Sequence, residues 1–548
     1  MSTYCIGIDT GGTFTDAVLL DTATGKVAQQ AKERTTHHDL SIGVAKALTK
    51  LFAADIAPES VTQLAVSTTL ATNAVVEGHG ARVALFVLGH VRHFKLPIVA
   101  NIFLKGGHTI TGEEDQPLDM EELVDMLQGL RNEVDSYAVC GAMSIQNPTH
   151  ELVTEKAISL VDPGKPVFCS HQVSTHPGML ERSATACLHA KLQPLMVSFL
   201  SSIQRAMLAL GLECPVTIIC GDGTGASLEK TVARAAVTMA SGPAATARFG
   251  AASEHKTALI VDIGGTTTDI CLVKDGAPTM SKEGCRIGQW RTHVDAVDMY
   301  TAAGGGDSHI KCDRKGKISL HPYRVQPLAM TPDLPDPKQW LKTGKDAYLV
   351  LPVETNKDQQ LADPVVQYLA ANGPASPSKI EMATGIQGIA LEKKLERLAY
   401  DQHVILAGFT PTDALHAMGL LSIGNAAASQ AGARVLAAEM SLSPEVFCKQ
   451  SVTTAGNAIE KIILTYLART TWSMEQAAVL LNKKSSDFFS IHFSLDLPII
   501  GIGAAAKYFL PEIAKRLHTT VTFPEHFEVG NAIGAALIGK EQSHPNYS

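Results

Sequence analysis

The chain contains one unusual polar turn twice, once near its start and once near its middle. Residues 9–16 read DTGGTFTD and residues 262–269 read DIGGTTTD, so six of the eight positions are identical. Each copy lies between two apolar runs, which predicts a strand, a glycine turn and a second strand. Backbone N–H groups and threonine hydroxyls in such a turn can donate hydrogen bonds to phosphate oxygens. We therefore expect the two turns to face each other and grip a polyphosphate from both sides.

The acid that opens each copy stands at the end of the preceding predicted strand. A carboxylate in that place can hold a hydrated divalent cation such as Mg²⁺, which prefers hard oxygen ligands. Asp9 and Asp262 are therefore the predicted metal-binding and catalytic residues. The predicted phosphate contacts are the glycines and hydroxyl residues of the turns: Gly11, Gly12, Thr13, Thr15, Gly264, Gly265, Thr266 and Thr267. The alternative is a pair of hairpins in a duplicated fold without a ligand. No Walker-type GxxxxGK[ST] motif occurs.

Other polar residues lie where strands are expected to end. Thr68, Thr69 and Asn73 fall at a strand-to-helix junction, where free N–H groups attract a substrate carboxylate or phosphate. Ordinary capping of that helix is the alternative. Asp222 ends another predicted strand, at the sheet edge where ligands of α/β proteins gather, and is predicted to contact the substrate or the cation.

Two histidines raise the question of a transition metal. His171 and His176 flank a short polar stretch, their spacing matches no regular ligand motif, and we expect no cysteine partner near them. The sequence therefore argues against a metal at this place. The ten cysteines are scattered without a CxxC pair, which is typical of buried, reduced thiols.

The bulk properties exclude several classes of protein. The chain has 548 residues, 46 basic against 54 acidic, and no basic block, so nucleic-acid binding has no electrostatic support. No apolar stretch approaches the roughly 20 residues of a membrane helix, and the start does not resemble a signal peptide. We therefore expect a cytoplasmic protein that binds neither nucleic acid nor membrane. A chain of this length exceeds one compact core, so two or more lobes are expected.

Short apolar runs, glycine turns and helical periodicities alternate along the chain and predict an α/β protein. The first forty residues predict a three-stranded antiparallel meander, and 181–210 predicts a helix pair broken near Pro194. The proline-rich stretch 315–365 suggests a flap or an insertion rather than core. Residues 540–548 are predicted to be a disordered tail.

The paired turns resemble the two phosphate motifs of the actin-like ATPase superfamily. Within it, the opening GIDTGGTFTDAVLLD resembles the hydantoinase A/oxoprolinase family, the ATP-handling subunits of ATP-dependent amide and lactam hydrolases. Further matching stretches follow in order: STTLATNAVVEGHGARVALFV, NPTHE, ERSATACLHAKLQP, SGPAAT and TAAGGGDSH. The resemblance implies an actin-like (ribonuclease H-like) α/β fold with two lobes around a nucleotide cleft. It implies an N-terminal domain over 1–190 and a second domain over 191–548.

The resemblance adds further nucleotide contacts. Gly304, Gly305 and Gly306 correspond to glycines that let the backbone approach the nucleotide, and Asp307 and His309 beside them are expected to face the cleft. A plain loop is the alternative. Gly501 and Gly503 correspond to the adenosine-side turn. Ser241, in SGPAAT, is expected to cap a helix behind the nucleotide.

The family resemblance implies ATP and Mg²⁺ as cofactors and the ATP-dependent hydrolysis of a cyclic amide, such as a hydantoin or 5-oxoproline, through a phosphorylated carbonyl. It also implies a hydantoinase B-like second subunit and a homo- or hetero-oligomer. Two alternatives stay open: a kinase for a small metabolite, and a non-catalytic nucleotide switch or activator.

Overall fold

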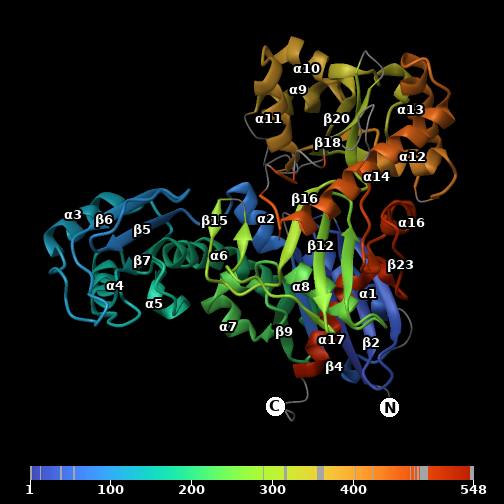
Figure 1. The fold of residues 1–548 in the computed structure, drawn as a ribbon. Coiled ribbons are helices and arrows are strands. Elements are labelled where there is room, and N and C mark those ends of the chain that lie inside the picture. The colour runs from blue at the N-terminus through green and yellow to red at the C-terminus, as the bar shows by residue number, and fades with distance from the viewer. Residues whose placement is uncertain are drawn as a thin grey trace. The chain divides into compact units, whose positions relative to one another are not determined.

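The computed structural model describes the chain except residues 1–2, 13, 37–39, 53–55, 288, 314–316, 354–362, 401–402, 423, 470, 474–475, 478–480, 482–490 and 543–548. The chain folds into two compact units. Figure 1 draws the ribbon of the whole chain. Unit 1 holds Met1–Thr257, Cys271–Met299 and Val529–Ser548, and unit 2 holds Ala258–Ile270 and Tyr300–Glu528. Each unit contains one of the two repeated turns.

Unit 1 is built on a six-stranded sheet in the order β10-β9-β4-β1-β2-β3. Its strands are β1 (Tyr4–Thr10), β2 (Phe14–Asp21), β3 (Val27–Arg34), β4 (Val61–Thr68), β9 (Val216–Ile219) and β10 (Gly225–Ala226). Strands β1, β2 and β3 pair antiparallel, which confirms the predicted meander. Strand β4 runs parallel to β1 and β9 runs parallel to β4, so these three strands end at the same edge.

The last helix of the chain returns to this first sheet. Helix α17 (Gly530–Gln542) approaches β1 so closely that a Cβ on Gly7 would lie 2.0 Å from the carbonyl oxygen of Ala532. A Cβ on Gly534 would likewise lie 1.8 Å from the carbonyl oxygen of Ala245 in α8 (Ser241–Ala251). Glycine at both positions therefore lets α17 seat against the sheet and against α8.

A second sheet of unit 1 has four parallel strands in the order β6-β5-β7-β8 (Figure 1). They are β5 (Val83–Leu88), β6 (Ala100–Leu104), β7 (Ser136–Gly141) and β8 (Val167–Cys169). Its core includes Phe86, Tyr137 and Leu123. The other helices of unit 1 are α1 (Leu40–Leu51), α2 (Leu70–Glu77), α3 (Met120–Leu130), α4 (Thr149–Val161), α5 (Ser170–Val173), α6 (Met179–Ala209) and α7 (Leu228–Ala233).

Helix α6 corrects the prediction of a broken helix pair, because its 31 residues continue through Pro194. A proline inside a helix removes the N–H that would bond to the carbonyl four residues earlier. That carbonyl belongs to Ala190, and it accepts a hydrogen bond from the Ser136 hydroxyl at 3.1 Å instead. The next carbonyl, of Lys191, accepts from the backbone N–H of Ala81 at 3.0 Å. Other segments of the same chain therefore satisfy the two carbonyl groups that have no hydrogen-bond donor within the helix.

Unit 2 carries the second turn between β11 (Ala258–Ile263) and β12 (Thr267–Lys274). Strand β11 runs parallel to β22 (Ile499–Ile502), which runs parallel to β23 (Val521–Thr522). A further sheet has the order β19-β21-β20. Its strands are β19 (Gln326–Pro327), β20 (Tyr348–Pro352) and β21 (Val404–Gly408), and helix α14 (Pro444–Ala468) places Phe447 in the core beside Phe409.

The remaining helices of unit 2 are α9 (Pro364–Asn372), α10 (Pro377–Thr384), α11 (Gly388–Tyr400), α12 (Pro411–Ala417), α13 (Ala426–Glu439) and α16 (Ala506–Arg516). The remaining longer strands are β16 (Met299–Ala303), β17 (Ser308–Cys312) and β18 (Ile318–Arg324). Three two-residue strands belong to unit 1: β13 (Ala277–Pro278), β14 (Arg286–Ile287) and β15 (Trp290–Arg291).

Two predictions about irregular segments are corrected. Where 315–365 is described, Leu328 and Val350 are fully buried, so this stretch contributes core and is not only a flap. Its side chains pack there because strands β19 and β20 pair with β21. Residues 540–542 end helix α17 and are not tail, while 543–548 lie outside the described residues. Whether 315–365 is an insertion into the family fold stays a prediction, as do the domain limits 1–190 and 191–548.

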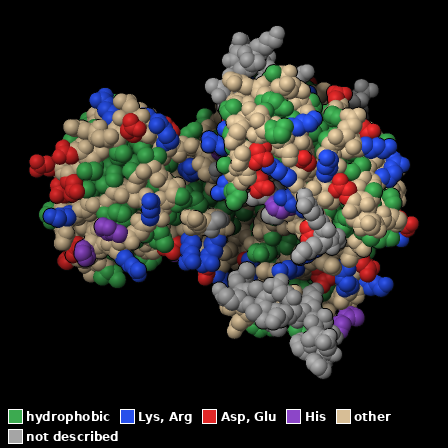
Figure 2. Space-filling view, turned by 90° about the horizontal axis from the view of Figure 1, so that it is seen from above, with side chains coloured by type: hydrophobic (Ala, Val, Ile, Leu, Met, Phe, Trp, Pro, Cys, Tyr) green, Lys and Arg blue, Asp and Glu red, His purple; other side chains and the backbone are tan. Residues whose placement is uncertain are grey.

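The described helices include none that is both long and apolar enough to cross a membrane. On the face drawn in Figure 2, basic and acidic side chains are interspersed. That distribution agrees with the near balance of 46 basic and 54 acidic residues in the chain.

Candidate functional site: two glycine turns with buried acids

Asp9, the acid of the first turn, is buried at the carboxyl end of β1 with 5% of its surface exposed. The Ser67 hydroxyl donates a hydrogen bond to Asp9 Oδ1 at 2.7 Å, and the Asn531 amide donates to Oδ2 at 3.4 Å. Burial raises the pKa of Asp9 to about 6, although both hydrogen bonds act in the opposite direction. A cation beside this carboxylate would offset the cost of its buried charge, so the donor set fits a metal ion.

The first turn itself is held by backbone and hydroxyl contacts. The Gly11 N–H donates to the Phe14 carbonyl at 3.0 Å, and the Thr35 hydroxyl donates to the Gly11 carbonyl at 2.8 Å. Thr15 is fully buried, and its hydroxyl lies 3.1 Å from that of Thr35. The Thr15 side chain therefore lies among the contacts that support the turn. Thr13 lies outside the described residues.

The predicted anion site at the start of α2 lies beside the first turn. The Thr69 N–H donates to the Thr10 carbonyl at 3.1 Å, and the Asn73 amide donates to the Thr69 hydroxyl at 3.2 Å. A Cβ on Gly12 would lie 3.2 Å from Asn73 Nδ2. The Thr68 hydroxyl is buried, accepts from the Leu70 N–H at 3.0 Å and donates to the Thr10 carbonyl at 3.3 Å, while Thr69 occupies the cap position of α2 without a side-chain hydrogen bond.

Ser241 is not a helix cap, in contrast to the expectation from the sequence. It is the first residue of α8, and Ala240 occupies the cap position without a side-chain hydrogen bond. The Ser241 hydroxyl donates to the Thr68 carbonyl at 2.8 Å and accepts from the Thr68 N–H at 3.0 Å. These bonds fix the start of α8 next to β4. A Cβ on Gly242, the following residue, would lie 3.6 Å from Asp9 Oδ1.

The second turn has the same local construction in unit 2. Asp262, at the end of β11, is 8% exposed, and the Gly264 N–H donates to the Thr267 carbonyl at 3.0 Å. Gly503 has a φ of +86°, and a Cβ there would lie 2.6 Å from Asp262 Oδ1. Only glycine fits so close to the acid in this conformation.

Gly501, predicted to lie at the adenosine-side turn together with Gly503, is placed differently. It lies within strand β22, and a Cβ there would fall 2.4 Å from the ring of Phe523 and 2.8 Å from Leu510. The side chains of Phe523 and Leu510 therefore fill the space on the side of Gly501 where a Cβ would lie. A nucleotide contact of Gly501 stays a prediction.

The three glycines Gly304, Gly305 and Gly306 lie against the second turn. The Gly304 N–H donates to the Thr266 carbonyl at 3.2 Å, and the Gly306 N–H donates to the Gly264 carbonyl at 3.0 Å. A Cβ on Gly305 would lie 2.5 Å from the carbonyl oxygens of both Gly264 and Gly265. The triple glycine therefore lets the backbone pack directly on the turn that is predicted to bind phosphate.

Asp307 also belongs to this arrangement. Its N–H donates to the Gly265 carbonyl at 2.7 Å, and a Cβ on Gly265 would lie 2.5 Å from Asp307 Oδ2. The Thr412 hydroxyl donates to the Gly306 carbonyl at 2.8 Å. His309, in contrast, is 2% exposed and its Nε2 lies 3.1 Å from the Ala347 carbonyl oxygen. Burial lowers the pKa of His309 to about 3, and a cleft-facing position of this side chain stays a prediction.

Two further predicted groups are placed as follows. Asp222 Oδ1 accepts from the N–H and the hydroxyl of Thr224 at 2.8 and 2.7 Å, so it organises its own turn. His171 and His176 have different partners, because the His176 ring lies 5.0 Å from that of His293 while His171 bonds to Glu151. The premise that no cysteine lies near His171 is wrong, since Cys169 lies within 4.8 Å of it.

Sequence reasoning missed the partners that reach these acids from distant parts of the chain. Asn531 lies 522 residues from Asp9, and Thr412 lies 105 residues from Asp307. The glycine-rich start of the last helix, VGNAIG, is the signal that could have pointed to Asn531.

Family models match most of the chain. The hydantoinase/oxoprolinase N-terminal region matches residues 5–161, and hydantoinase/oxoprolinase matches residues 182–537, more than half of the chain. The chain belongs to the hydantoinase/oxoprolinase family. The resemblance seen in the sequence is thereby confirmed.

Two relatives in this family have described activities. Caprolactamase subunit alpha of Pseudomonas jessenii is 28% identical over 364 residues, which cover 58% of this chain and 50% of the relative. The acetophenone carboxylase gamma subunit of Aromatoleum aromaticum is 28% identical over 356 residues, which cover 57% and 48%. The chain thus spans about half the length of the curated relatives it matches.

Solved structures share the fold. Nucleotide-free acetone carboxylase matches with a TM-score of 0.68 at 16% identity, over 98% of this chain and 70% of that one. The ATP-dependent caprolactamase of Pseudomonas jessenii matches with a TM-score of 0.63 at 21% identity, over 97% and 70%. These likenesses confirm the predicted α/β, actin-like ATPase fold of this family member.

Proposed function

We propose that this chain binds Mg·ATP through its two glycine turns and transfers the terminal phosphoryl group to the carbonyl oxygen of a cyclic amide. The observation that carries the proposal is the repeated construction itself. Each unit has a buried acid, Asp9 or Asp262, just before a glycine turn. A glycine lies close to each carboxylate, Gly242 near Asp9 and Gly503 near Asp262. A hairpin in a merely duplicated fold would need the glycines but not the two buried carboxylates.

The residues of the turns supply binding and positioning. Backbone N–H groups and the hydroxyls of Thr266 and Thr267 donate to phosphate oxygens, while Asp9 and Asp262 hold waters around the cation. When bound, Mg²⁺ neutralises charge that develops on the phosphates. Fixed donors of this kind need no reorganisation during the transfer, which is the main contribution of protein groups to such chemistry.

The chemistry makes an unreactive amide carbonyl electrophilic. The bond between the terminal phosphorus of ATP and its bridging oxygen breaks, a bond from that phosphorus to the substrate carbonyl oxygen forms, and ADP leaves. One water molecule then adds to the activated carbon and the ring C–N bond breaks, which leaves an acyl phosphate. A second water molecule hydrolyses the acyl phosphate to the carboxylate and inorganic phosphate. Hydantoins, 5-oxoproline and related lactams are the proposed substrate class, and the relative from Pseudomonas jessenii is named a caprolactamase.

A second polypeptide is proposed to complete the hydrolysis. Both relatives are named as subunits, and this chain spans about half of their length. We propose a hydantoinase B-like partner, assembly into an oligomer and a cytoplasmic location.

The test is ATP turnover with Mg²⁺ against a panel of lactams, hydantoins and sugars, with product identified by mass spectrometry. Substrate-stimulated release of ADP with lactams or hydantoins, and its loss in Asp262→Asn, would support the proposal. The control is Asp275→Asn, because Asp275 is exposed at a turn with a φ of +54°, which asparagine also tolerates. A stable phosphorylated sugar as the product would instead identify a kinase, and turnover unchanged in Asp262→Asn would contradict the role of that acid.

A further inference from the structure

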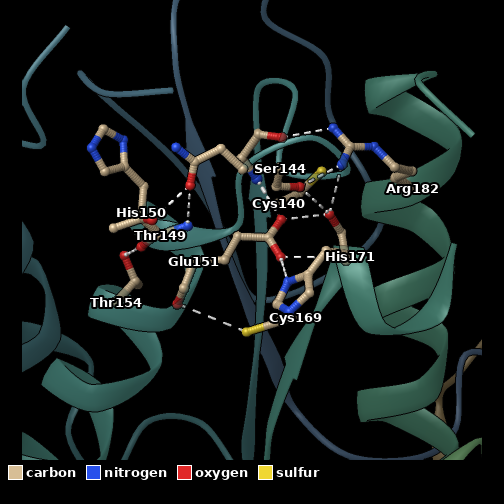
Figure 3. Close-up of polar contacts among 12 residues, drawn as sticks. Cys140, Ser144, Thr149, His150, Glu151, Thr154, Cys169, His171 and Arg182 are labelled. Carbon is tan, nitrogen blue, oxygen red and sulfur yellow. Dashed lines mark hydrogen bonds and ion pairs between the residues drawn. The ribbon is translucent and has the colours of Figure 1, made fainter. Parts of the chain in front are cut away.

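A group of side chains of the kinds that bind metals lies in the four-stranded part of unit 1. It consists of Glu151 on α4, Cys169 at the end of β8 and His171 on α5 (Figure 3). One ligand atom from each of the three lies within 4.8 Å of the others, and among the described residues this is the one group of its kind. Glu151 and Cys169 are fully buried, whereas the His171 side chain is 18% exposed.

A further carboxylate lies on the same face of helix α4. Glu155 follows Glu151 by four residues, one helical turn later, so the two carboxylates project from the same side. Burial raises the pKa of the Cys169 thiol first, and the nearby carboxylates of Glu151 and Glu155 raise it further. The group of three offers one carboxylate oxygen, one sulfur and one imidazole nitrogen, and Glu155 adds negative charge beside it.

The Glu151 carboxylate is oriented by neighbours that are not part of the group. Oε1 accepts from the Gly141 N–H at 2.7 Å and from the Ser170 hydroxyl at 2.6 Å. The guanidinium of Arg182 is fully buried and donates to the Gly141 carbonyl at 2.7 Å and to the Ser170 hydroxyl at 3.2 Å. Groups that hydrogen-bond to a ligand in this way fix its orientation and raise metal affinity.

We propose that Glu151, Cys169 and His171 bind one Zn²⁺ ion, with water as the fourth ligand. Thiolate, imidazole and carboxylate are all ligands that zinc takes in tetrahedral coordination. The carboxylate and the thiolate carry two negative charges, which Zn²⁺ balances. Such a site would tie α4 to the short edge strand β8 and to α5, so its role is to stabilise this part of unit 1.

The side chains need only a small displacement to accept the ion. His171 Nδ1 and Glu151 Oε2 are 2.5 Å apart. Ligands of a tetrahedral zinc ion with bonds near 2.0 Å lie about 3.3 Å from one another. Rotation of the partly exposed imidazole supplies that separation. Because zinc takes cysteine as the thiolate, the Cys169 thiol releases its proton when the ion binds.

The test uses the full chain, stripped of metal with a chelator and titrated with Co²⁺ as a spectroscopic substitute for Zn²⁺. We expect a thiolate-to-Co²⁺ charge-transfer band that saturates at one ion per chain and disappears when Zn²⁺ is added. Cys169→Ala should abolish the band, whereas Cys187→Ala, which removes another fully buried thiol of unit 1, should retain it.

The histidine is tested by a matched pair. His171→Gln should weaken Co²⁺ binding strongly, whereas His176→Gln should leave it unchanged, because the His176 ring lies against His293 instead. If Cys169→Ala fails to fold, Ser170→Ala provides a milder variant, with an expected loss of zinc affinity of about 10–100-fold. No thiolate band in the unmodified chain, or a band that persists in Cys169→Ala, would overturn the proposal. ATP turnover does not enter this test, so its outcome is independent of the proposed function.

Discussion

At the scale of single residues, the carboxylate of Asp9 carries an energetic cost that a ligand can relieve. Its pKa in the folded chain, about 6, lies above the ordinary value of 3.8 because the group is buried. The folded state therefore binds the proton more tightly than the unfolded state does. The stability that this provides is fully present below about pH 4 and is lost as the pH rises towards 6.

The residue-scale prediction is that Asp9→Asn stabilises the nucleotide-free protein at pH 7.5. The rise of the pKa from 3.8 to about 6, which already includes the opposing hydrogen bond from Ser67, corresponds to a gain of about 3 kcal/mol. At pH 4 the difference from the unmodified chain should largely vanish. Urea unfolding at both pH values, without nucleotide or Mg²⁺, measures this. The same pH dependence in the exposed control Asp275→Asn would contradict it.

At the scale of elements, the sequence predicted those features that are determined by residues close together in the chain. The two turns and the meander of β1, β2 and β3 follow from glycines between short apolar runs, so the sequence showed them directly. Helix α6 was misread because the group that compensates Pro194 is the Ser136 hydroxyl, 54 residues away from Ala190. The contact of Asn531 with Asp9 was missed for the same reason, since no local pattern reports a partner 522 residues distant.

The element-scale prediction concerns the long helix α6. Ser136→Ala should destabilise unit 1 by about 1–3 kcal/mol, because the Ala190 carbonyl loses its donor in a buried position. In a Pro194→Ala background the cost should be smaller, since alanine restores the backbone N–H that normally bonds to that carbonyl. A double-mutant cycle measured by urea unfolding gives the coupling between the two sites. Equal costs of Ser136→Ala in both backgrounds would show that the hydroxyl does not act through Ala190.

At the scale of the whole molecule, the comparisons establish the family and the fold, whereas the reaction that the chain carries out is our proposal. The family models match residues 5–161 and 182–537, and the solved acetone carboxylase and caprolactamase chains share the fold. We propose that the glycine turns bind ATP and position the phosphoryl transfer, and we assign the attack of water on the activated carbon to a partner.

The last prediction is that the purified chain alone hydrolyses ATP slowly and does not open lactam rings efficiently. The phosphorylated intermediate must react with a water molecule held in the site, because an intermediate that escapes into bulk solvent is lost to the reaction. Adding a hydantoinase B-like protein should therefore increase the ring-opened product together with ADP. The measurement follows both products by chromatography with a lactam panel, ATP and Mg²⁺, with and without the partner. Asp262→Asn, supplied with the partner, is the control that should abolish both increases. Efficient ring opening by the chain alone would show that it contains the hydrolytic groups itself.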